Sequence, residues 1–110
     1  MASPLEPPPN PYGASAASII GAAGQFAIRA GIDVRVGRDP AQCAITLAEP
    51  RVSGVHATLR FENGALMVRD EGSNNGTYVN GSRIEEVTLR SNDEVQIGKF
   101  KLTFVAAADR

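Results

Sequence analysis

Short runs of alternating apolar and polar residues, separated by turn-forming residues, constrain the fold of this protein more than any other feature. In the run 56–61, Ala57, Leu59 and Phe61 share one face of an extended strand. Similar runs, rich in β-branched and aromatic residues, recur at 26–30, 33–36, 43–47, 65–70, 77–79, 87–89, 94–97 and 101–105. No segment after residue 24 has a capped helical period. The pattern predicts an antiparallel β-sandwich or barrel of many short strands.

Two Asn-Gly pairs stand unusually close together in the stretch SNNGTYVNG. They are Asn75-Gly76 and Asn80-Gly81, with three residues between them. Asn-Gly is a strong turn signal because both residues tolerate positive φ. One turn is enough to reverse the direction of the backbone, so one of the pairs is expected to serve another purpose.

Composition narrows the class of protein. A length of 110 residues makes one domain at most, and 43% hydrophobic residues is an ordinary share for a globular fold. The formal net charge of −1 argues against a nucleic-acid partner or a membrane surface, which require a basic face. The lone Cys43 has no partner for an internal disulfide, which favours a reducing, cytoplasmic location.

The N-terminal residues differ in composition from the rest. Residues 1–22 hold five of the seven prolines beside Ala, Ser and Gly, a composition typical of a flexible linker. The segment 14–24 lacks the basic flank of a signal peptide, and no stretch is long enough to insert into a membrane. We therefore expect a flexible tail or linker at 1–22, a folded domain at 23–106 and a C-terminal tail at 107–110.

Catalytic and metal-binding motifs are weak in this sequence. Ser53 and His56 could suggest a nucleophile and a base, but at this spacing on entering a strand they are expected to face opposite sides, with no acid to orient the ring. One His and one Cys exclude a Cys/His zinc site. The segment GRDPAQCA lacks the end of a phosphate-binding P-loop. We expect neither an enzyme nor a bound metal or cofactor.

The predicted loops instead hold residues suited to binding an anion. Arginine offers a planar fork of donors that matches phosphate, and hydroxyls, side-chain amides and loop N–H groups can complete the shell around it. These residues fall in three separate loops and are Gly37-Arg38, then Arg51, Ser53 and Gly54, then Ser73, Asn74 and Asn75.

The order and spacing of these blocks resemble the forkhead-associated (FHA) domain. The resemblance rests on Gly37-Arg38, Ser53-x-x-His56, Asn75-Gly76-Thr77 and Asn80-Gly81, and it extends over about residues 25–106. It implies a β-sandwich of about eleven short strands that binds phosphothreonine peptides through loops at one end. It also implies a recognition module rather than an enzyme.

The resemblance implies roles for individual residues at the phosphate. Arg38 matches the arginine that contacts the phosphate, and Ser53 matches the serine whose hydroxyl and loop amide accompany it. Asn74 takes the loop position that often helps at the phosphate or at the threonine methyl. Gly54 departs from a frequent polar choice, so only its backbone amide remains and the phosphate shell is expected to be thinner.

Other matched positions imply contacts with the peptide or support of the loops. Asn75 matches the asparagine that bonds the peptide backbone, which would explain the first Asn-Gly pair. Arg51 matches a position that can read a peptide residue on the C-terminal side of the phosphothreonine. The remaining matches are expected to be structural and are Gly37, His56, Gly76, Asn80 and Gly81.

Two other functions are compatible with a β-sandwich. One is a structural domain that assembles through a phosphate-independent surface. Such a domain would be expected to have lost Arg38 or Ser53, and both are present. The other is a carbohydrate-binding sandwich, which is disfavoured because the sequence has no Trp and two Tyr. Five further arginines are expected to be solvated charges on strand faces, namely Arg29, Arg35, Arg60, Arg69 and Arg83.

The source of the phosphothreonine can also be inferred. The tail at 1–22 contains no threonine, and every threonine of the sequence falls in a predicted strand or beside one. A threonine held in a sheet could reach the loops only after local unfolding. The phosphothreonine is therefore expected to come in trans, from another protein or from segments outside these residues.

Overall fold

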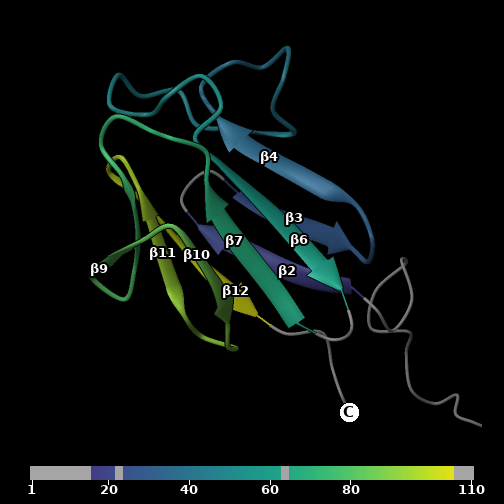
Figure 1. Ribbon diagram of the computed structural model, residues 1–110. Helices are drawn as coiled ribbons and strands as arrows, with labels where there is room; N and C mark the ends of the chain where they lie inside the picture. Colours follow the sequence, from purple (N-terminus) through teal and green to yellow (C-terminus); the bar gives the residue numbers. More distant parts are fainter. Residues whose placement is uncertain (1–15, 22–23, 63–64, 106–110) are drawn as a thin grey trace, which may run out of the picture.

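Two β-sheets packed face to face make up the fold (Figure 1). The computed structural model describes residues 16–21, 24–62 and 65–105. The five-stranded sheet has the order β10-β7-β6-β4-β5, and the six-stranded sheet has the order β3-β2-β12-β11-β8-β9. The strands are β2 (Ala16–Gly21), β3 (Gly24–Arg29), β4 (Asp33–Gly37), β5 (Ile45–Thr46), β6 (Ala57–Glu62), β7 (Ala65–Asp70), β8 (Thr77–Val79), β9 (Ser82–Ile84), β10 (Glu86–Leu89), β11 (Glu94–Ile97) and β12 (Phe100–Val105).

This arrangement confirms the predicted all-β sandwich of about eleven short strands. No residue in the described ranges lies in a helix, so these ranges hold no helix that could cross a membrane. All neighbouring strands are antiparallel except β4 and β5, which pair in parallel through Val36 with Ile45 and Gly37 with Thr46.

The alternation read from the sequence decides which side chains enter the core. On β6, Ala57, Leu59 and Phe61 are buried between the sheets, and Leu102 and Phe104 of β12 are buried opposite. The five arginines assigned to strand faces lie outside this core, and Arg60 and Arg69 pair there with carboxylates of the same sheet. Burial of one face of each strand therefore follows directly from the two-residue period.

Residues 16–21 correct the predicted tail. They form β2, which lies between β3 and β12. Ile19 is fully buried and pairs with Phe26 on one side and Phe104 on the other. The flexible tail predicted for 1–22 is thus wrong for these six residues, whereas 1–15, 22–23 and 106–110 lie outside the described residues. Small residues around Ile19 give little signal alone, and the neighbouring strands supply the stability that propensity does not.

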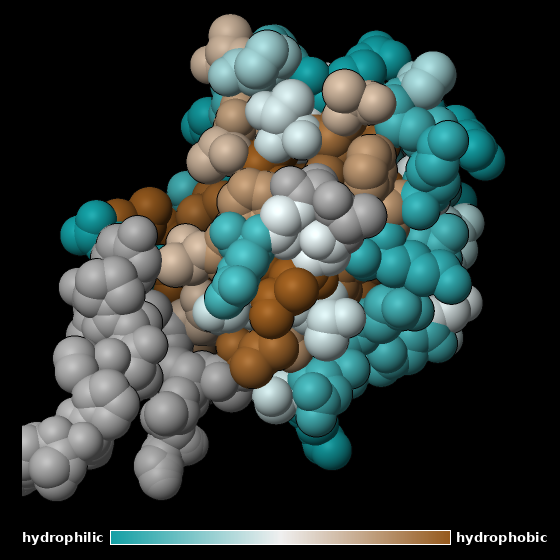
Figure 2. All heavy atoms as spheres, turned by 180° about the vertical axis from the view of Figure 1, so that it is seen from behind, coloured by the Kyte–Doolittle hydropathy of each residue, from teal (hydrophilic) through white to brown (hydrophobic). Residues whose placement is uncertain are grey.

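The outer face of the six-stranded sheet is seen in Figure 2, where apolar side chains gather in the middle of the view and hydrophilic ones border them. Ile20 of β2 belongs to this sheet and is 40% exposed. Because Ile19 and Ile20 are neighbours on a strand, one enters the core and the other faces outward.

The second Asn-Gly pair forms the predicted hairpin. Asn80 and Gly81 have φ of 50° and 90°, which suits the tight turn that joins β8 to β9. Strand β9 itself was not predicted, because Ser82, Arg83 and Ile84 show too short an alternation. Of the strand predicted at 43–47, only Ile45–Thr46 forms a strand, which is β5.

Loops from both sheets gather at one end of the sandwich. In Figure 1 the long connections after β4 and before β6, together with the β7–β8 connection, lie at the top of the view. All three blocks of anion-binding residues lie in these connections or at their borders. The fold therefore brings together residues that are up to 37 positions apart in the sequence, counting from Arg38 to Asn75.

Candidate functional site

Backbone hydrogen bonds fasten the first two loops to each other. Arg38 N donates to Ser53 O at 2.9 Å and Asp39 N donates to Gly54 O at 3.2 Å. A Cβ atom on Gly37 would overlap the Gly54 carbonyl oxygen and lie 2.9 Å from Cys43 Sγ. Only glycine leaves room for this close approach, which supports the structural role inferred for Gly37.

His56 joins the second loop to the third. Its side chain is fully buried. Its Nδ1 accepts a hydrogen bond from Ser53 N at 3.1 Å, so its Nε2–H donates to Gly76 O at 2.9 Å. This pairing requires the neutral ring with the proton on Nε2. A ring held between two backbones is geometry suited to a structural role.

The Ser53 hydroxyl faces the third loop rather than the imidazole. Ser53 Oγ accepts a hydrogen bond from Asn74 N at 3.3 Å. The imidazole of His56 contacts the Ser53 backbone, and its other nitrogen meets a carbonyl instead of a carboxylate. This arrangement agrees with the rejection of a Ser-His catalytic pair. It also places the Ser53 hydroxyl and the Asn74 amide side by side.

The side chains of Arg38, at the first loop, and Asn75, in the third loop, both bond to residues 50–51 of the second loop. Arg38 Nη1 donates to Pro50 O at 3.2 Å, and Asn75 Nδ2 donates to Arg51 O at 2.9 Å. Both side chains are exposed. The carbonyl groups of residues 50 and 51 therefore hold a guanidinium and an amide over the same loop end, next to Ser53.

Glu49 is a residue at this site that the sequence pattern did not predict. It is 6% exposed, and its carboxylate pairs with Nε of the 62% exposed Arg51 at 3.1 Å. Burial opposes ionisation of Glu49, but hydrogen bonds from the side chain and backbone of Arg51 and from the backbone of Lys99 bring its pKa below the ordinary value. Glu49 thereby orients Arg51. An acidic residue in a loop gives no sequence signal of burial, so it could not have been found.

Asp70 shapes the third loop, and it too was missed. Its carboxylate accepts hydrogen bonds from Ser73 Oγ at 2.5 Å, from Thr77 Oγ1 at 2.7 Å and from Ser73 N at 3.0 Å. Ser73 Oγ in turn accepts from Gly76 N at 2.9 Å. Burial raises the pKa of Asp70, but these bonds and one from Gly72 N outweigh it and leave the pKa below 3.8. The loop that presents Asn74 and Asn75 is thus built on an ionised carboxylate.

Asp70 predicts an acid-sensitive stability. Because its pKa is lowered by folding, the ionised form stabilises the domain above the unfolded value near 3.8, and this contribution is lost as the pH falls through the lower folded value. We expect Asp70→Asn to cost about 1–3 kcal/mol at pH 7, since it removes the charge and replaces one of the two oxygens, each of which accepts two hydrogen bonds, by a donating NH2 group. In urea titrations, the difference in the free energy of unfolding between the unaltered protein and Asp70→Asn should shrink below pH 3.8. A difference that does not depend on pH would contradict this role.

Gly54 has space for a side chain. A Cβ atom there would meet only Asp39 Cβ, at 4.0 Å. We expect Gly54→Ser to raise phosphate-dependent affinity about fivefold, because one more hydroxyl can donate to the anion and a hydrogen bond contributes about 1 kcal/mol. Gly54→Ala is the matched control, since it adds the Cβ atom without the hydroxyl. Calorimetry in which alanine and serine have the same effect would contradict a phosphate contact at this position.

The assembled site has the chemistry suited to recognising an anion. A guanidinium, a hydroxyl, side-chain amides and loop N–H groups converge at one end of a rigid scaffold. Within the described residues no group of three or more His, Cys, Asp or Glu side chains could hold a metal ion. Fold and site together define a β-sandwich module that presents a group of loop residues suited to binding an anion.

Comparison with known proteins assigns the family. The model of the FHA domain matches residues 34–98, more than half of the sequence, and this protein belongs to that family. The glycogen accumulation regulator GarA of Mycolicibacterium smegmatis is 48% identical over 69 residues, which are 63% of this chain and 43% of the relative. The aligned part therefore spans less than half the length of that relative.

Solved structures agree with this assignment. The FHA domain of the CT664 protein from Chlamydia trachomatis has a TM-score of 0.81 and 28% identity, covering 86% of this protein and 100% of that one. Mycobacterium tuberculosis EmbR, solved in complex with a low-affinity phosphopeptide, has a TM-score of 0.77 and 27% identity, covering 87% of this protein and 26% of that one.

Proposed function

We propose that this domain recognises phosphothreonine peptides and mediates phosphorylation-dependent protein–protein interaction. The observation that supports this best is the convergence of Arg38, Ser53 and Asn75 from three loops on one end of an FHA fold. Arg38, Ser53, Asn74 and the Gly54 amide would contact the phosphate. The phosphopeptide complex of EmbR is consistent with this use of the fold.

Asn75 and Arg51 are proposed to contact the peptide rather than the phosphate. Asn75 already donates to a main-chain carbonyl, that of Arg51, and would bond the peptide backbone in the same manner. Arg51 is largely exposed, with one nitrogen paired to Glu49. The rest of its guanidinium would read an acidic residue on the C-terminal side of the phosphothreonine.

The phosphothreonine is proposed to come from another protein. All five threonines of the sequence lie in strands, at positions 46, 58, 77, 88 and 103. Presenting any of them to the loop end would require local unfolding of its sheet. We propose a cytoplasmic location as well, which the unpaired, buried Cys43 thiol supports.

A comparison of matched peptides tests this function. We expect a phosphothreonine peptide to bind about fourfold or more tightly than its phosphoserine counterpart, because burying one methyl group contributes about 0.8 kcal/mol. The unphosphorylated peptide should not bind measurably. Calorimetric titration of the three peptides would decide the matter, and equal affinity of all three would overturn the proposal.

A further inference from the structure

Three hollows on the described surface share lining residues and therefore adjoin one another along β7. The first, of about 450 Å³, is lined by Asp70, Gly72, Ser73, Arg83, Ile84 and Glu85. The second, of about 330 Å³, shares three of these residues and adds Arg69 and Glu86. The third, of about 140 Å³, shares Arg69 and Glu86 and adds Asp33, Thr58, Arg60 and Met67. We call their combined surface the β7 groove.

One end of the β7 groove borders the loop that carries Asn74 and Asn75. Ser73, which lines its first part, immediately precedes Asn74, whose amide bonds the Ser53 hydroxyl. Arg83 lines the same part, and its guanidinium lies against Gly76, where a Cβ atom would be 2.7 Å from Arg83 Nε. The first hollow therefore lies beside the loop that presents Asn74 and Asn75.

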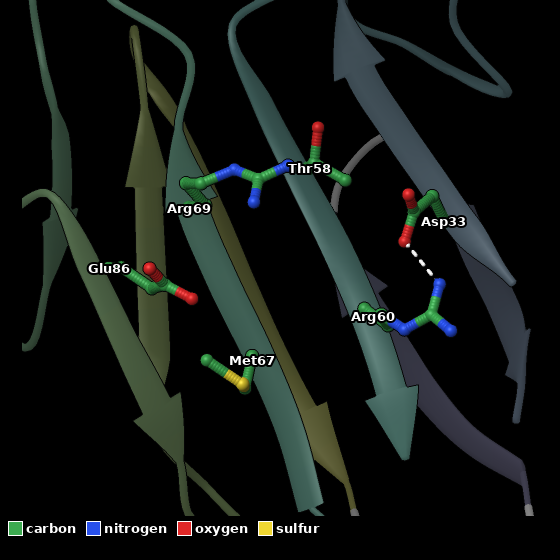
Figure 3. A pocket seen from close by; sticks show the side chains of 6 residues that line it. All are labelled: Asp33, Thr58, Arg60, Met67, Arg69 and Glu86. Carbon is green, nitrogen blue, oxygen red and sulfur yellow. Dashed lines mark hydrogen bonds and ion pairs between the residues drawn. The ribbon is translucent and has the colours of Figure 1, made fainter. Parts of the chain in front are cut away.

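The groove then passes onto the outer face of the five-stranded sheet. Asp70 N donates to Glu85 O at 2.7 Å where β7 ends, and one residue further Arg69 pairs with Glu86 across the strands. Figure 3 shows the far part of the groove, where Arg69 of β7 extends toward Thr58 of β6, Arg60 of β6 extends toward Asp33 of β4, and Met67 of β7 extends toward the β10 side. From Asp70 to Met67 is three residues, or about 10 Å along a strand.

The charges of the groove are balanced rather than of one sign. Arg60 pairs with Asp33 at 2.8 Å and with Glu62 at 3.0 Å, and Arg69 pairs with Glu71 at 3.1 Å. Met67 of β7 is 37% exposed, and it is the partner of Arg60 of β6 in the register of the two strands. A polyanion would be repelled by the acids. A polypeptide segment with mixed charges and one apolar residue matches this surface.

We propose that the β7 groove binds the part of the phosphorylated partner that flanks the phosphothreonine, as an extended segment with an apolar residue packed over Met67. This inference rests on the proposed phosphothreonine recognition and extends it from one residue to a longer surface. The groove borders the loop that carries Asn74 and Asn75, so the tether through the phosphothreonine raises the local concentration of the flanking segment there. A flank of about six residues is needed to reach Met67, at roughly 3.3 Å per residue.

Two phosphothreonine libraries test the proposal on the full 110-residue protein. One has about three random residues on each side of the phosphothreonine, and the other has about twelve, which spans the groove at roughly 3.3 Å per residue. We expect selection from the longer library to enrich an apolar residue about six or more positions from the mark. The selected long peptide should bind about tenfold more tightly than the same peptide cut to the shorter flank.

Substitutions then test whether residues of the β7 groove cause the gain in affinity of the longer peptide. Met67→Glu and Arg60→Glu should remove most of the tenfold gain and leave the affinity of the short peptide unchanged. Ile20→Glu is the matched control, because Ile20 is exposed to a similar degree, 40%, but belongs to the other sheet. Melting curves confirm that all three variants are folded.

The outcomes separate this inference from the function it rests on. If the short peptide binds and the long one binds no better, or if Met67→Glu keeps the gain, the groove proposal is wrong and phosphothreonine recognition stands. If neither phosphopeptide binds the folded protein, both proposals are wrong.

Discussion

Replacing Arg38 by alanine is expected to weaken phosphopeptide binding by about 10- to 100-fold without lowering the melting temperature. The guanidinium is exposed and makes a 3.2 Å hydrogen bond to Pro50 O, so its loss leaves no buried group unpaired. In the complex it would donate to phosphate, and a hydrogen bond to a charged group contributes about 1.5–3 kcal/mol. Calorimetry and thermal unfolding of the same preparation measure the two effects separately.

Arg35→Ala is the matched control for this substitution. Arg35 lies on β4, which leads directly to Arg38, is exposed, and also donates from Nη1 to a loop carbonyl, that of Gln42 at 3.3 Å. It is not part of the proposed phosphate shell, so its loss should leave affinity within about twofold. Full binding by a folded Arg38→Ala protein would remove Arg38 from the site.

Replacing His56 by alanine, in contrast, is expected to lower the stability of the domain more than its affinity for phosphopeptide. The ring is fully buried and bonds the backbones of Ser53 and Gly76. Its removal leaves a cavity and two unpaired backbone groups, so the free energy of unfolding should fall by about 2–5 kcal/mol. Urea denaturation at neutral pH measures this loss.

Affinity distinguishes a structural His56 from a binding one. Measured at low temperature, where the variant is still folded, the dissociation constant should rise far less than for Arg38→Ala. Some weakening is expected because Ser53 and the Asn74–Asn75 turn lose their common support. A well-folded His56→Ala protein that fails to bind phosphopeptide would show that the ring does more than hold the loops.

Much of the fold could be predicted because the relevant signals are local. The side chains of a strand alternate every two residues, so the burial of Leu59 and Phe61 could be inferred without knowing their neighbours. The positive φ of Asn80 and Gly81 likewise follows from the pair itself. Strand β2 was missed because one buried isoleucine among small residues resembles a linker.

The sequence pointed to the donors of the candidate site and to the buried His56, but not to the two carboxylates that support its loops. Arg38, Ser53 and Asn75 carry donors suited to phosphate or peptide, and their order along the sequence resembles that of the FHA family. Glu49 and Asp70 gave no such signal, because a carboxylate in a loop or at the end of a strand is ordinarily solvated. Only the packed structure shows that these two are held by Arg51, Ser73 and Thr77.

The amino-acid sequence by itself determined most of the strand pattern and the second Asn-Gly hairpin, since each depends on a residue and its immediate neighbours, and it supplied the residues that are proposed to bind the anion. The tertiary structure alone decided which loops meet, because contacts such as that of His56 with Gly76 join residues 20 positions apart. It also decided that Gly37 must lack a side group where the second loop crosses it. Such contacts depend on how two sheets pack, and no local pattern records that.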